Sequence, residues 1–477
     1  MVVTPGSHPV AALETTTMKK IKSQNHTKAA IFAGAAALMA LTPQTHAQSS
    51  VDALLNKLEQ KGILSVDEAK ELKADNATNS VNDFNKELGA KFPTPDWVTS
   101  YKLYGDFRGR FDDVSAGMPA YKNSSGNVAD DNNIRLRYRL RVGLTVNMKD
   151  DLQVGFRLGT DDAASGNTTG GNPLSNNTTL QGNGSKKFIF VDAAYGKWTP
   201  INDGTWMVAG TIGKMDQPFQ ASPMVFDPDY TPEGGALQAT YKINGQNSLA
   251  FNGGAFVIDQ SNSRGPYLLG AQAIWNAAWS PKIGTSLGIA AYDLANQASL
   301  NASSATGSYY DSNLGNTIVA GLPAREFNPF VVSGSTTYTL DSFPLYPGAF
   351  PVKLAGEFMD NPAAASNNKG WWGGVTLGKS GKKGTWDVSY RYQKLEADAW
   401  WDQLVDDDNV TLFPTSLAGG SAAGGTNIKG HLVKFNYSVF DSLTFSLTAY
   451  INDLINNPVA GAKTDTMHLM ADLMWKF

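Results

Sequence analysis

The sequence predicts an all-β transmembrane fold, a 16-stranded antiparallel up-and-down β-barrel preceded by a short helical hairpin. Amphipathic segments of about ten residues follow one another from Tyr101 onward, and this is the length of a tilted membrane strand. The connections between them are alternately long and short, as in outer-membrane barrels. Beyond residue 47 no apolar run approaches the roughly 18 residues of a membrane helix, so a membrane-spanning chain would have to cross with strands.

Residues 1–47 have the three parts of a secretory signal peptide. The basic start Met18-Lys-Lys-Ile-Lys22 precedes a short apolar run from Ala29 to Leu41, and Thr45-His-Ala47 supplies a small-residue cleavage site. We predict translation from Met18 and cleavage after Ala47. A membrane anchor is the alternative, but the run is shorter than the roughly 20 residues that span a bilayer.

The composition excludes several kinds of function. The chain has no cysteine, so it has neither a disulfide framework nor a thiolate metal site. The net charge of −4 becomes −7 once residues 1–47 are removed, because they hold four lysines and one glutamate. Such an acidic exported chain is unsuited to general nucleic-acid binding. We expect no catalytic site, no cofactor and no metal centre.

Residues 48–75 are predicted to form a periplasmic helical hairpin. Val51, Leu54, Leu55 and Leu58 have helical spacing, Gly62 is a helix stop, and Ser65 with Glu68 has the spacing of a capping box. A spacer is the plainer interpretation of this hairpin, and oligomerisation or contact with the cell wall is the other. Residues 76–96 form a linker, and the barrel occupies residues 97–477.

Sixteen strands are expected, an even number. They run roughly over 101–112, 134–148, 152–160, 187–198, 205–214, 234–243, 248–258, 267–279, 283–293, 327–339, 349–359, 370–379, 385–395, 427–439, 442–453 and 466–477. The connection after Thr339 departs from the short-turn pattern, since it holds Pro344 and Pro347. The last segment ends in Phe477, which resembles the C-terminal signal that directs barrel proteins to the outer-membrane assembly machinery.

Seven of the ten arginines are predicted to share the inner face of three consecutive strands. Because side chains alternate along a strand, Arg135 to Arg141 place four cations opposite Leu136, Tyr138 and Leu140. The full set is Arg108, Arg110, Arg135, Arg137, Arg139, Arg141 and Arg157. So many cations require water and carboxylates nearby, which indicates one wall of an aqueous pore. Surface arginines paired with acidic neighbours are the alternative.

The third long connection, from Lys214 to Gly234, differs from the other long loops. It is rich in proline and aromatic residues and poor in glycine, asparagine and serine. By analogy with 16-stranded general porins, this loop would fold into the barrel and narrow it. Its acidic residues Asp216, Asp227, Asp229 and Glu233 would then face the arginine wall and set a transverse field across the constriction. A loop packed on the rim is the alternative.

Four segments together resemble the putative porin family of Gram-negative outer membranes. They are the arginine strand 135–141, Gly213–Phe219, Asp227–Gly234 and the late hairpin segment 386–398. The resemblance covers nearly the whole mature chain. It implies an outer-membrane channel for passive diffusion of small hydrophilic solutes and ions, surrounded by lipid and lipopolysaccharide and inserted by the barrel-assembly machinery. The chain is similar in length to general porins, and by analogy with them we expect a homotrimer.

The sequence gives weaker support for three other functions. A substrate-specific channel for anions or sugars would also use the arginines. A barrel enzyme would need a nucleophile with a base in reach, and the mature chain keeps only His431 and His468. A soluble adhesin of several sandwich domains is a third class. The run Asp406-Asp-Asp408 could bind Ca²⁺, although a solvated acidic loop is favoured.

Overall fold

The computed structural model describes residues 95–116, 121–122, 128–129, 132–162, 171–259, 265–297, 314–319, 322–416, 419–457 and 463–477. The predicted signal peptide and helical hairpin lie outside this range, as does the linker up to residue 94, and all three remain predictions. Within the described residues, no helix has the length and apolar character needed to cross a bilayer.

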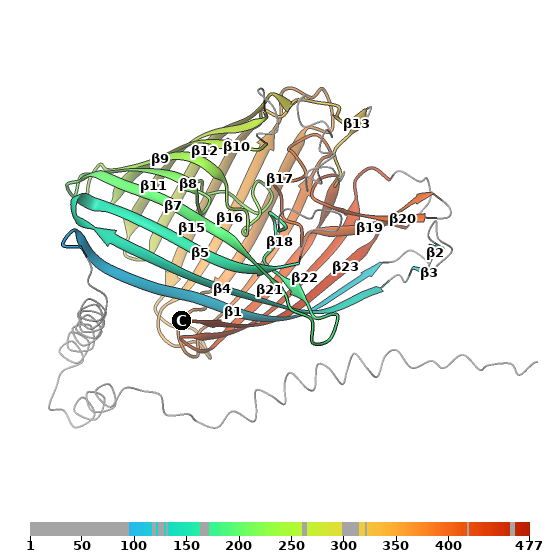
Figure 1. Ribbon diagram of the computed structural model, residues 1–477, viewed down its shortest axis with the longest axis horizontal. Helices are drawn as coiled ribbons and strands as arrows, with labels where there is room; N and C mark the ends of the chain where they lie inside the picture. Colours follow the sequence, from blue (N-terminus) through green and yellow to red (C-terminus); the bar gives the residue numbers. More distant parts are fainter. Residues whose placement is uncertain are drawn as a thin grey trace, which may run out of the picture. The chain divides into compact units, whose positions relative to one another are not determined.

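Sixteen antiparallel strands form a closed ring (Figure 1). They are β1 (Val98–Ala116), β4 (Asn132–Met148), β5 (Leu152–Asp161), β7 (Phe188–Asn202), β8 (Trp206–Lys214), β9 (Glu233–Lys242), β10 (Asn247–Val257), β11 (Tyr267–Ser280), β12 (Ile283–Ala295), β15 (Phe330–Leu340), β16 (Phe350–Asp360), β17 (Lys369–Gly378), β18 (Trp386–Leu395), β21 (Ile428–Phe440), β22 (Leu443–Leu454) and β23 (Thr466–Lys476). Each strand pairs with the next, and β1 pairs with β23 to close the ring. All sixteen predicted segments are confirmed, with ends within four residues.

Shorter elements lie between the barrel strands, and sequence reasoning missed them. They are β2 (Tyr121–Lys122), β3 (Val128–Ala129), β6 (Thr178–Thr179), β13 (Ile318–Val319), β14 (Leu322–Pro323), β19 (Val410–Ser416), β20 (Gly419–Gly424) and the 3₁₀ turn η1 (Lys149–Asp151). Most are too short to show a period of two. The strand β6 pairs with Arg137 and Tyr138 of β4, beyond the point where β5 leaves that strand.

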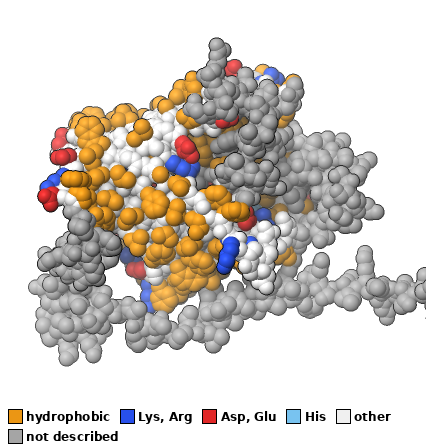
Figure 2. Space-filling view, viewed as in Figure 1, with side chains coloured by type: hydrophobic (Ala, Val, Ile, Leu, Met, Phe, Trp, Pro, Cys, Tyr) orange, Lys and Arg blue, Asp and Glu red, His pale blue; other side chains and the backbone are white. Residues whose placement is uncertain are grey.

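The two faces of the ring have opposite polarity. On β4, Leu136 is 54% exposed on the outside, whereas Arg139 is 5% exposed and faces inward. Figure 2 shows many apolar side chains spread over the visible outer surface of the ring, with charged groups mostly toward its edges. Five of the six exposed tryptophans among the described residues lie at the short-turn end of the strands: Trp97, Trp198, Trp206, Trp279 and Trp475. This apolar exterior with an aromatic belt is the surface that a bilayer requires.

The irregular connection after β15 carries its own apolar contacts. Within residues 341–349, Phe343 stacks on the Phe350 ring at 4.1 Å between centroids, and Tyr346 meets the Phe350 ring edge-on at 4.9 Å. The indole of Trp386 donates a hydrogen bond to the carbonyl oxygen of Leu345. Packed rings therefore hold this connection, which is longer than a tight turn.

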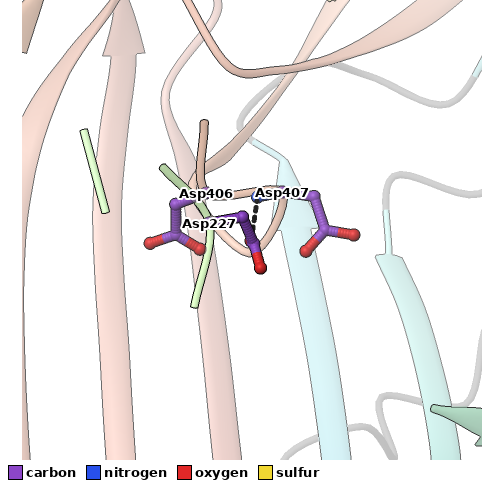
Figure 3. Close-up of side chains that lie close together, drawn as sticks. All are labelled: Asp227, Asp406 and Asp407. Carbon is purple, nitrogen blue, oxygen red and sulfur yellow. Dashed lines mark hydrogen bonds between the residues drawn. The ribbon is translucent and has the colours of Figure 1, made fainter. Parts of the chain in front are cut away.

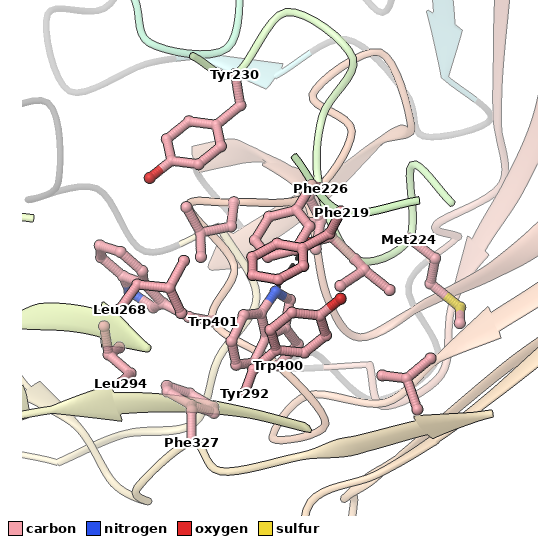
Figure 4. Packing of buried hydrophobic residues seen from close by; sticks show 14 of the residues in the cluster. Phe219, Met224, Phe226, Tyr230, Leu268, Tyr292, Leu294, Phe327, Trp400 and Trp401 are labelled. Atoms are coloured by element: carbon pink, nitrogen blue, oxygen red, sulfur yellow. Dashed lines mark hydrogen bonds between the residues drawn. The ribbon is translucent and has the colours of Figure 1, made fainter. Parts of the chain in front are cut away.

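Two long loops pack inside the ring. The β8–β9 loop (residues 215–232) and the β18–β19 loop (residues 396–409) contribute half of one buried apolar cluster. Phe219 packs against inward-facing Phe256 of β10 and Tyr292 of β12. Trp400 is fully buried, and its indole donates to the carbonyl oxygen of Val225 at 2.8 Å (Figure 4). The two loops thus hold each other against the inner wall of β10–β15.

Candidate functional site

The strand register places carboxylates opposite two of the β4 arginines and places arginines opposite the other two. Across β1 and β4, Asp106 lies opposite Arg141, Arg108 opposite Arg139, and Asp112 opposite Arg135. Cross-strand neighbours lie about 5 Å apart, so each carboxylate can reach guanidiniums on the adjoining strand. The alternation of side chains that predicted the arginine face therefore also builds its ion pairs.

Six of the seven arginines form ion pairs with carboxylates. Arg110 contacts Asp408 at 3.0 Å and Asp472 at 2.8 Å, and Arg135 contacts Asp112 at 2.9 Å. Arg139 and Arg141 share Asp106 and Asp229, Arg137 lies 3.6 Å from Asp112, and Arg157 bonds to Asp192 and Asp216. Arg108 instead donates to the Asn177 side chain at 2.6 Å. The positive charge of this wall is therefore largely compensated by the protein itself.

The four acidic residues predicted on the third loop have different interaction partners. Asp229 accepts from Arg139 at 2.9 Å and Asp216 accepts from Arg157 at 2.7 Å, so these two meet the arginine wall. Asp227 is buried and accepts from the backbone amides of Asp229 and Asp407. Glu233 lies at the start of β9 and pairs with Lys214 at 3.3 Å, and no ion pair joins it to the arginines among the described residues.

The run Asp406–Asp408 is not the solvated acidic loop that the sequence favoured. Asp406 is buried and accepts from the Tyr450 hydroxyl at 2.7 Å, while Asp408 reaches Arg110. Asp227 from the β8–β9 loop approaches Asp406 and Asp407, and the amide of Asp407 donates to Asp227 (Figure 3). The burial of residues 406–408 could not be predicted from the sequence, because their contacts with Asp227 join segments about 180 residues apart.

These loop carboxyls have opposite tendencies to ionise. Burial and the nearby carboxylates Asp407 and Asp406 raise the pKa of Asp227 well above its usual range. Burial also disfavours the charged form of Asp408, but the Arg110 guanidinium outweighs it and holds the pKa of Asp408 below its usual range. Asp408 is therefore the ionised partner of the wall, and Asp227 tends to keep its proton.

The raised pKa of Asp227 predicts a pH-dependent stability. The folded protein retains this proton at pH values where the unfolded chain has lost it, so the free energy of unfolding falls as the pH rises from about 4 through the raised pKa. We expect Asp227→Asn to make stability less dependent on pH. The measurement is the temperature at which folded mobility on gels is lost, between about pH 5 and about pH 9. An unchanged slope in the variant would contradict the assignment.

A cavity of about 530 Å³ lies inside the ring, and both walls contribute to it. Its lining includes Arg108, Arg139 and Asp229 on one side and Lys353, Arg391 and Lys434 of β16, β18 and β21 on the other. Among the described residues, none of the latter three cations forms an ion pair. Sequence reasoning missed them because they are spread over three strands, none of which has more than two lysines or arginines.

Comparison with known proteins gives a family match. The model of a family described as "Putative porin" matches residues 114–320. None of the curated proteins matches the chain.

Several solved structures are similar to this chain at low identity. OprB of Pseudomonas putida has 11% identity and a TM-score of 0.47, covering 79% of this chain and 94% of that one. A triple mutant of the Rhodopseudomonas blastica porin has 11% identity and a TM-score of 0.39, covering 79% and 100%. The outer-membrane channel DcaP of Acinetobacter baumannii has 14% identity and a TM-score of 0.39, covering 79% and 97%.

The family match includes the arginine strand, the inward β8–β9 loop and the apolar outer wall described above. Each of these features suits a channel, and the family is one of channels rather than enzymes. The chain is therefore a porin-like outer-membrane β-barrel, similar over residues 114–320 to the family described as "Putative porin".

Proposed function

We propose that the barrel is a water-filled channel through which small hydrophilic solutes and ions diffuse passively. The observation that carries this proposal is the charged cavity inside a ring whose outer face is apolar. Charged groups on both walls can replace part of the hydration shell of a passing ion or polar solute. An interior of this kind would be costly in a dry core.

The constriction in this proposal lies between the inward loops, which contact the arginine wall, and the opposite wall of β16, β18 and β21. Asp216 and Asp229 of the β8–β9 loop and Asp408 of the β18–β19 loop stand against Arg157, Arg139 and Arg110. These ion pairs hold the loops on the arginine wall, and the charged and polar groups that line the remaining space favour polar solutes over apolar ones. Two loops, rather than the third loop alone, would then narrow the channel.

The surroundings of the barrel form part of the same proposal. Outer-membrane lipid and lipopolysaccharide would cover the apolar exterior, and the assembly machinery would recognise the last strand with Phe477. The backbone of Phe477 exchanges hydrogen bonds with Gly105 of β1, at 2.9 and 3.1 Å. A homotrimer, and cell-wall contact through residues 48–75, remain predictions from the sequence.

The proposed function is tested by conductance in planar bilayers. Purified folded protein is expected to produce stepwise, voltage-independent current increments in KCl, and heat-denatured protein serves as the control. A radiolabelled-sugar release assay from proteoliposomes would show passage of neutral solutes. Folded protein that inserts into bilayers without carrying current or releasing solute would overturn the proposal.

A further inference from the structure

The wall opposite the arginines carries a row of hydrogen-bond donors. The register joins Lys353 of β16 to Thr376 of β17, Thr376 to Ser389 of β18, and Ser389 to Lys434 of β21. All four residues line the cavity inside the ring. Neighbouring strands lie about 4.8 Å apart, so two hydroxyls stand side by side between two lysines.

A fifth donor stands beside this row. Arg391 lies two residues beyond Ser389 on β18 and therefore faces the same cavity. Its guanidinium carbon is 5.5 Å from the centroid of the Trp372 ring, which fixes the group against the wall. The Arg391 Nε atom is buried and has no hydrogen-bond partner among the described residues.

The two lysines of this row are less compensated than the arginine wall, although the loop residues Asp406, Asp407 and Asp408 line the same cavity. Lys353 and Lys434 are exposed to the cavity, and no ion pair forms on either within the described part of the chain. The nearest carboxylate on β18, Asp387, accepts instead from the Ser380 amide and from the Asn436 side chain at 2.6 Å. In the arginine wall, by contrast, six of the seven cations are paired with carboxylates.

We propose that Lys353, Thr376, Ser389, Lys434 and Arg391 form a binding subsite for small oxyanions, that is, solutes with a carboxylate or phosphate group. Two hydroxyl donors can bond to two oxygens of one such group while the flanking cations supply its counter-charge. A neutral sugar would gain nothing from the lysines. This inference rests on the proposed channel and names the class of solutes that would bind inside it.

The subsite is tested first by binding, without any current. Inorganic phosphate and acetate are titrated calorimetrically into the detergent-solubilised full chain. We expect the double variant K353Q/K434Q to bind both roughly tenfold more weakly, since each cation about 6 Å from an anion in water contributes roughly threefold. The matched control is K282Q/K382Q, which removes two lysines paired with Asp341 and Asp441 at the turns. Equal binding by wild type and K353Q/K434Q would overturn the subsite.

Conductance then separates this inference from the proposed function. In a KCl gradient, the anion-to-cation permeability ratio should fall in K353Q/K434Q and stay unchanged in the turn control. T376A/S389A keeps both lysines and should lose phosphate affinity while keeping the KCl permeability ratio. Phosphate binding without any current would support the subsite and overturn the channel. Current with unchanged selectivity and unchanged phosphate binding in K353Q/K434Q would overturn the subsite alone.

Discussion

Replacing Arg110 with alanine is expected to lower the free energy of unfolding of the barrel by about 3–5 kcal/mol. Arg110 is 6% exposed and bridges Asp472 of β23 and Asp408 of the β18–β19 loop, at 2.8 and 3.0 Å. Without the guanidinium, two partly buried carboxylates would face each other with no cation between them. The measurement is the temperature at which the folded, fast-migrating form disappears on gels.

The control for this variant is Arg135→Ala, on the same wall. The Arg135 side chain is 32% exposed, and its partner Asp112 also accepts from His468. Solvent screening and the remaining partner should limit the loss to about 1 kcal/mol. If both variants shift the transition equally, the bridge between the β18–β19 loop and the wall is not what stabilises the interior.

Replacing Trp400 with alanine is expected to have the second large effect, a loss of about 3–5 kcal/mol. Trp400 is fully buried among Phe226, Tyr292 and Phe327. Its indole N–H donates a hydrogen bond to the carbonyl oxygen of Val225. Its removal takes away the surface on which the β8–β9 loop rests. That loop should swing away from the arginine wall, and single-channel conductance should increase.

Trp371→Ala is the matched control, because Trp371 lies on β17 with 41% of its surface exposed on the outer face. It removes an equal volume from the lipid-facing side and should leave the conductance unchanged. A Trp400→Ala channel with wild-type conductance would show that the β8–β9 loop keeps its place by its ion pairs alone.

The barrel itself could be predicted from the sequence, because strand alternation is local. Leu136 and Arg137 are adjacent in the sequence and therefore lie on opposite faces of the strand. The same two-residue period continues along every strand. The same alternation placed all seven arginines inward. The contacts of Asp216 and Asp229 with these arginines were expected only by analogy with general porins, and the same analogy wrongly included Asp227 and Glu233.

The contacts of the inward loops could not be predicted in this way. Arg110 and Asp408 are 298 residues apart, and no period links a loop carboxylate to a strand cation. Asp227 and Glu233 lie in the same loop region as Asp229, yet one is buried under Asp407 and the other points to Lys214. Likewise, Lys353 and Lys434 become neighbours of one row only after four strands have been placed in register.

Closure of the ring through β1 and β23 makes folding an all-or-none event. The eleven residue pairs from Asp106 and Lys476 to Ala116 and Thr466 join parts of the chain that are separated by about 350 residues or more. Until the last strand docks, β1 and β22 would each present unpaired amides and carbonyls to the acyl chains, at several kcal/mol apiece. A partly assembled barrel therefore has no stable resting state in the bilayer, and insertion and completion must be coupled.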